Sequence, residues 1–271
     1  MTNFLNLLTL GSMNIRATLL LGIILLTASF AMADDERWFM NYYKQPKPEE
    51  VNTHLIEWQR QGLLKADNTK WVMLGFLCQV MRDNPKLVKN WLVTSESFSS
   101  QERDAVLQAA WFSNGSAAIS YFKEQKLQTF LENKPPSVDS IPIEHPSVLD
   151  FYWSRYFASG NRDCIRTVIS ALKYQTYSGA LDKYKTSQHT EQDKKAALYD
   201  TIFQSAMWSL ESNCKQDEKV YAICKDFLFS NKLSKPEQMF LGVVLSKVRP
   251  DDVKVELPTE TGKTSNTNNA H

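Results

Sequence analysis

The chain has 271 residues, with 31 Lys and Arg against 30 Asp and Glu, so its formal net charge is +1. Hydrophobic residues make up 43% of it and only nine glycines occur. This composition fits a globular protein with a sizeable core and disfavours turn-dense β architectures. A near-neutral chain lacks the overall positive charge that attracts nucleic acid, so we expect no nucleic-acid partner.

The N-terminus has the three parts of an export signal. Arg16 precedes an apolar run over residues 17–30, and the Ala-Met-Ala sequence at 31–33 matches the small-x-small pattern that signal peptidase cleaves. The run is shorter than the roughly 20 residues that a membrane span needs. We therefore expect cleavage between Ala33 and Asp34, export to the periplasm with secretion as the alternative, and no stable membrane insertion after cleavage.

Met13 begins a conventional signal n-region on its own, because a basic residue, Arg16, follows it closely. The sequence thus predicts that translation starts at Met13 and not at Met1. Cleavage of residues 1–33 removes only Arg16 among the charged residues, so the mature chain has equal numbers of basic and acidic residues.

Helices are predicted one after another in the first half of the mature chain. Aromatic residues within 38–43 are expected to dock onto the body, before prolines at 46 and 48 interrupt any helix. Apolar residues at helical spacing then predict a helix up to Gly62, which is its C-cap, and a helix that a capping box of Ser99 and Glu102 begins. Similar spacing predicts further helices over 71–81, 87–93 and 119–131.

Four prolines within residues 134–146 mark the clearest irregular stretch of the chain. We interpret it as a connector between an N-terminal helical subdomain, 34–133, and a C-terminal one, 147–250. Before it, Asn114-Gly115 is a turn signal.

The C-terminal half repeats the helical pattern. Ser147 and Asp150 are expected to cap a helix, and further helices are predicted near 161–172, 193–213, 220–227 and 234–244. Residues 175–191 are polar and predict a loop. The tail, 251–271, lacks aromatic residues and predicts disorder.

These elements predict an all-α fold without a sheet. Serial helices joined by short turns favour an array of antiparallel helical hairpins, either an irregular α-solenoid or a two-lobed helical bundle. No tetratricopeptide pattern and no clean internal repeat occurs in the sequence.

Two segments of the chain are similar to known sequences. LDFYWSRYFASGNRDCIRTVISAL, residues 149–172, and AMWSLESNCKQDEKVYAIC, residues 206–224, resemble a group of uncharacterised exported helical proteins of Gram-negative bacteria. The resemblance implies helices and export. It implies no catalytic residues.

Four cysteines, Cys78, Cys164, Cys214 and Cys224, lie in the mature chain, and an even number in an oxidising compartment favours disulfides. Cys214 lies beside a turn and Cys224 about two helical turns beyond it. A rise of ~1.5 Å per residue and a helix separation of ~8–10 Å would put this pair beyond the ~7 Å reach of a bridge. Cys164 begins one helix and Cys214 ends the next, so antiparallel packing predicts a Cys164–Cys214 disulfide. Four buried free thiols are the alternative.

No catalytic, cofactor or metal motif has the spacing and context that its chemistry requires. His54 and Glu57 lie one helical turn apart, which is typical of a surface pair, and HExxH is absent. Ser170 and Lys173 form an S-x-x-K string without its companion motifs. We therefore expect no catalytic residue, no cofactor and no metal.

The aromatic segment FYWSRYF, residues 151–157, carries more aromatic residues than one buried stripe needs. Tyr152, Arg155 and Tyr156 are the candidates for contact with a partner, because aromatic and arginine side chains dominate recognition surfaces. Plain core packing is the alternative.

The functional expectation is an exported, non-catalytic module that binds a protein or a peptide, since stacked helices form extended concave surfaces. One alternative is an extracytoplasmic enzyme whose site brings together carboxylates from distant positions. Two or more converging carboxylates in one cleft would favour it. Another alternative is a secreted factor that acts on another organism.

Overall fold

The computed structural model describes residues 33–186 and 190–253. Helices and loops make up this whole part of the chain, and no strand occurs in it, which confirms the all-α fold class. The expected signal peptide up to residue 32 and the tail from 254 onward lie outside the described residues. Ala33 and Asp34, which flank the expected cleavage site, are the first two residues of helix α2.

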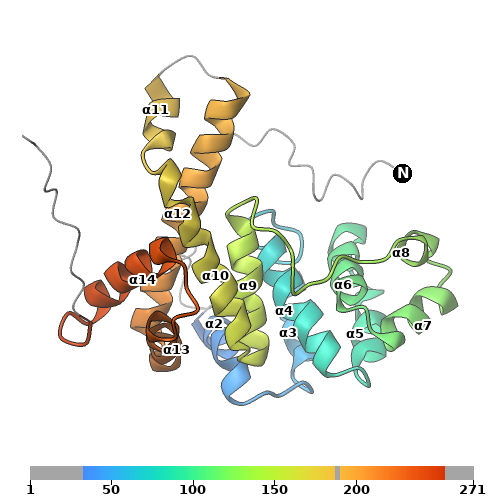
Figure 1. Cartoon of the computed structure of the whole chain (residues 1–271). Helices are drawn as coiled ribbons and strands as arrows, with labels where there is room; N and C mark the ends of the chain where they lie inside the picture. The colour runs from blue at the N-terminus through green and yellow to red at the C-terminus, as the bar shows by residue number, and fades with distance from the viewer. Residues whose placement is uncertain (1–32, 187–189, 254–271) are drawn as a thin grey trace, which may run out of the picture.

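The segment before the connector forms a series of short and medium helices (Figure 1). They are α2 (Ala33–Asn41), η3 (Tyr42–Lys44), α3 (Val51–Arg60), α4 (Lys70–Asp83), α5 (Val88–Ser95), α6 (Ser100–Ser113), α7 (Ser116–Glu124) and α8 (Gln128–Glu132). Gly62 follows α3 with a left-handed φ of 75°, and Ser99 and Glu102 form the expected capping box of α6. Asn114 ends α6 in the left-handed region, as its turn signal indicated.

The segment after the connector contains the longest helix. Its elements are α9 (Ser147–Ser159), α10 (Arg162–Ser170), η4 (Ala171–Tyr177), α11 (Ala180–Thr186), α12 (Glu191–Gln216), α13 (Glu218–Phe229) and α14 (Lys235–Val248). The expectation of a loop over 175–191 was wrong, because α11 lies within it. Leu181 of α11 is buried, and its backbone N–H donates to the Asp200 carboxylate of α12 at 3.0 Å. This tertiary contact leaves no local sequence signal.

Helices α9 and α10 lie in the middle of the molecule, with α3–α8 on one side and α11–α14 on the other (Figure 1). Helix α4 packs most extensively against α9 and α6, neither of which is its neighbour in sequence. A repeating array of hairpins would favour sequential neighbours. One buried cluster contains residues from both sides of 134–146, so the connector does not separate two hydrophobic cores.

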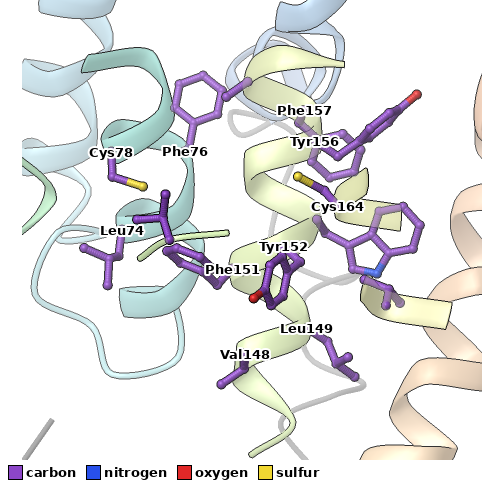
Figure 2. Close-up of a cluster of buried hydrophobic side chains, with 14 of the residues drawn as sticks. Leu74, Phe76, Cys78, Val148, Leu149, Phe151, Tyr152, Tyr156, Phe157 and Cys164 are labelled. Carbon is purple, nitrogen blue, oxygen red and sulfur yellow. The ribbon is translucent and has the colours of Figure 1, made fainter. Parts of the chain in front are cut away.

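The contact between α4 and α9 is close because of Gly75. A Cβ atom at Gly75 would lie 2.4 Å from the carbonyl oxygen of Phe151. Figure 2 shows the apolar side chains that fill the space beside this contact, among them Leu74 and Phe76 of α4 and Phe151 of α9. The two helices therefore form the centre of the core.

The N-terminal aromatic residues dock onto the body, as their composition predicted. The Phe39 ring stacks on Phe76 of α4 at 4.4 Å between centroids, and the Trp38 ring stacks on His54 of α3 at 3.7 Å. Tyr43 reaches the other side of the molecule, where its hydroxyl donates to the Asp217 carboxylate at 2.7 Å. The segment 38–43 thus contacts helices before and after the connector.

Candidate functional site

A pocket of about 220 Å³ lies between α9 and α12. Helix α9 contributes Asp150, Trp153, Ser154 and Phe157. These residues follow the i, i+3, i+4, i+7 spacing that places side chains on one face of a helix. This face of α9 forms one wall of the pocket and carries a carboxyl and a hydroxyl group.

Helix α12 forms the opposite wall, where residues at the same spacing are all polar and uncharged. Ser209, Ser212, Asn213 and Gln216 form a polar edge. Trp208, beside them, is 48% exposed although it is large and apolar. The pocket therefore has one edge that carries hydrogen-bonding groups and an accessible aromatic side chain.

The remaining lining is mainly apolar and comes from earlier in the chain. Phe39 and Met40 of α2, Trp58 of α3, and Val72 and Met73 of α4 contribute most of it. Trp58 is buried, and Phe39 is half-buried. The pocket thus depends on five helices that are far apart in sequence.

Among the described residues that line the pocket, Asp150 alone has an ionisable side chain. Its backbone carbonyl accepts a hydrogen bond from Ser154 Oγ at 2.5 Å. Among the described residues, none donates a hydrogen bond or forms an ion pair with its carboxylate. Burial raises the pKa of Asp150 from 3.8 to about 7. The carboxylate is therefore close to half ionised at neutral pH.

The expectation that Ser147 and Asp150 cap α9 was wrong. The N-cap of α9 is Pro146, and no side chain makes a capping hydrogen bond there. The Ser147 hydroxyl instead lies 2.5 Å from Nδ1 of His145. Asp150 is one turn further along, where its side chain lines the pocket.

The size of the pocket limits what it can hold. A cavity of ~150 Å³ accepts benzene, whereas pockets for drug-sized ligands span ~300–1,000 Å³. At about 220 Å³, this pocket fits one group of the size of an amino-acid side chain. A dinucleotide or a flavin would not fit inside it.

Tyr152, Arg155 and Tyr156 are all buried in the core, so they present no recognition surface in this structure. Arg155 Nη1 donates to the Val138 carbonyl at 2.6 Å and its Nη2 to Asp139 at 2.5 Å. Its Nε donates to the Gln79 side chain of α4 at 3.0 Å.

Two tyrosines of the C-terminal half form hydrogen bonds with the connector, residues 134–146. The Tyr152 hydroxyl donates to the Ile141 carbonyl at 2.8 Å, and the Tyr174 hydroxyl donates to the Ile143 carbonyl at 3.1 Å. Tyr156 packs against the ring of Tyr43. The hydrogen bonds of Tyr152 and Arg155 therefore have a structural role, which is the packing alternative that the sequence left open.

The four cysteines are buried free thiols. The structure brings Cys214 together with Cys224, and a hydrogen bond with Cys214 and burial raise the pKa of Cys224 above its ordinary value. The two side chains are neighbours because α12 continues to Gln216 and Asp217 alone separates it from α13, and both thiols are free. Cys164 is paired with neither of them and lies near the Arg155 guanidinium.

The other motifs have ordinary packing contacts. His54 stacks on Trp38, the Ser170 hydroxyl donates to the Thr167 carbonyl, and the Lys173 ammonium lies over the Tyr174 ring. Within residues 33–186 and 190–253, no three His, Cys, Asp or Glu side chains gather as metal ligands. No helix in this part of the chain is long and apolar enough to cross a membrane.

Comparisons with known proteins found no counterpart for this fold or sequence. No protein-family model matches the chain, and neither a curated protein nor a solved structure is significantly similar to it.

Proposed function

We propose that the chain is an exported, non-catalytic binding protein that holds a protein or peptide partner through the pocket between α9 and α12. The observation that carries this proposal is a pocket of side-chain size, about 220 Å³, with an accessible Trp208 and a polar edge beside it. Aromatic anchors and preformed pockets for single side chains are the usual centres of protein recognition.

The enzyme alternative has less support in this structure. It requires at least two carboxylates that converge in one cleft, and the lining of the pocket contains only Asp150. The buried acids elsewhere have partners of their own. Glu102 pairs with Lys65, and Glu237 pairs with Arg166.

Export is supported by the sequence at 1–33, with its apolar run and its small-x-small cleavage pattern. Fractionation of cells that produce the full chain tests this part of the proposal. We expect a mature protein that begins at Asp34 in the periplasmic fraction. Its presence in the culture medium would favour the secreted factor. A full-length protein in the cytoplasm would contradict export.

Selection of a random peptide library on the mature protein tests the pocket, with a variant that obstructs it. Ser212→Trp places a large side chain on a partly exposed pocket position of α12. We expect peptides selected on the wild type to lose at least about tenfold in affinity for this variant, because one hot-spot contact contributes ~2 kcal/mol or more. Fluorescence titration measures the affinities.

Ser205→Trp is the matched control. Ser205 lies on the same helix, is also partly exposed, and is not part of the pocket lining. Peptides selected on the wild type should bind this variant with unchanged affinity. Equal binding to both variants, or enrichment of no peptide at all, would refute the pocket as the partner site.

A further inference from the structure

We infer that the group held in the pocket is an organic cation, an ammonium or guanidinium on an apolar stem, with Asp150 as its counter-ion. The inference rests on the proposed function, because it specifies the chemistry of the same site. Charge complementarity, the aromatic walls and the amide oxygens of the polar edge carry it.

Charge complementarity is the first step. Buried carboxylates in proteins are paired or hydrogen-bonded. Elsewhere in the described chain this holds. Glu102 Oε1 lies 3.1 Å from Lys65 Nζ, and Glu237 Oε1 lies 3.0 Å from Arg166 Nη1, while the Asp200 carboxylate accepts hydrogen bonds from the Leu181 backbone N–H and the Gln204 amide. Asp150, which is half-buried, has no such partner in this part of the chain, and no Lys, Arg or His lines its pocket. A cationic ligand would supply the missing charge.

The aromatic walls favour the same kind of ligand. Trp58, Trp153, Phe157 and Trp208 all line the pocket. The faces of aromatic rings attract cations, most strongly when the cation has lost part of its hydration shell, and the ring bodies also accept an apolar stem. An anion would meet the Asp150 carboxylate and no cationic side chain in this lining, so it is disfavoured.

The polar edge on α12 also suits a hydrogen-bond donor. The Asn213 side-chain amide nitrogen already donates to the Ser209 carbonyl at 2.8 Å, and the Gln216 amide nitrogen donates to Ser212 Oγ at 2.9 Å. Their amide oxygens accept no hydrogen bond from the described residues. These two amide oxygens can therefore accept hydrogen bonds from the N–H groups of an ammonium or guanidinium.

Calorimetric titration of the mature protein with two probes tests the inference. One probe is phenethylammonium, and the other is 2-phenylethanol, which has a similar apolar body without the charge. We expect the ammonium to bind the wild type at least about tenfold more tightly, since hydrogen bonds to charged groups contribute most when desolvated. Asp150→Asn should remove this preference and leave the affinity for the alcohol within about twofold.

Asp163→Asn is the matched control, because Asp163 also lies in the first turn of a helix but is exposed and outside the pocket. This variant should keep the full preference for the ammonium. Trp208→Ala provides a second variant at an exposed position, where loss of the ring should weaken ammonium binding by about two- to fivefold. Circular dichroism confirms that each variant is folded.

The outcomes separate this inference from the proposed function. If both probes bind equally, or if Asp150→Asn retains the ammonium preference, the cation specificity is overturned while the pocket remains a binding site. If the selected peptides depend on the pocket but contain no Lys, Arg or accessible amine, the same conclusion follows. If neither probe binds and no peptide depends on Ser212, both proposals fail.

Discussion

At the scale of single residues, Asp150 couples the pocket to the stability of the fold. Burial raises its pKa from 3.8 to about 7, so the folded state binds a proton more tightly than the unfolded state. The stabilisation from this proton is complete below the unfolded pKa and is lost as pH rises through 7. The shift of this pKa corresponds to at most about 4 kcal/mol in the free energy of unfolding.

We therefore expect the stability of the wild type to fall relative to that of Asp150→Asn between pH 4 and pH 7.5. The variant should be more stable than the wild type at pH 8 and about equally stable at pH 4. Urea unfolding across this range measures the difference, with Asp163→Asn as a control that follows the wild type. Parallel profiles for the wild type and Asp150→Asn would contradict the assignment.

Sequence reasoning identified Asp150 but gave it the wrong role. An acidic residue in the first turn after a proline-rich segment is typical of a helix cap. The neighbouring residues in sequence do not indicate that it lines a pocket. Its true surroundings come from Trp58 and Trp208, which lie far away in sequence. One sequence feature could have indicated the pocket: an acid, a serine and two aromatic residues share one face of α9 at i, i+3, i+4, i+7 spacing.

At the scale of helices, the contact between α4 and α9 depends on the absence of a side chain at Gly75. We expect Gly75→Ala to destabilise the protein by about 2–4 kcal/mol, because its Cβ would clash with the backbone of Phe151 and force the helices apart. Gly115→Ala is the control, since its Cβ would make only an ordinary contact with Ser113 at 3.6 Å. Thermal unfolding of both variants measures the effect, and equal stabilities would contradict the close packing.

Arg155 connects α4 with the connector through its guanidinium. Replacement by Met removes the donor that connects Gln79 of α4 with residues 138–139 of the connector. We expect a loss of about 2–4 kcal/mol, because buried acceptors remain without a partner. Lys89→Met, which removes an exposed ion pair with Glu124, should cost less than about 1 kcal/mol. Denaturant unfolding compares the two.

Helices that begin with a capping box were predictable, as α6 and α14 illustrate. The sequence could not reveal α11, because its main anchor is the contact between Leu181 and Asp200. Nor could it reveal that α9 is buried on several sides. The abundance of aromatic residues in 151–157 reflects this burial and not a recognition surface.

At the scale of the whole molecule, one buried cluster extends across both sides of the connector. We expect a single unfolding transition in which tryptophan fluorescence and far-ultraviolet circular dichroism coincide. A fragment of residues 147–250 should not fold alone, since it lacks α4, the main partner of α9. Two separate transitions, or a folded fragment, would show that the halves are independent domains.

The hydrogen bond between Tyr43 and Asp217 joins residues 174 positions apart. At ~5–20 residues per second, the ribosome needs about 10–35 s to make the intervening chain. During that interval the aromatic residues near position 40 have been made, but their partners on α9 and beside α13 are still incomplete. The chain can therefore complete its fold only after nearly all of the described residues have been synthesised. Under the proposed export, the duration of synthesis sets a minimum time for which the exported chain remains incompletely folded.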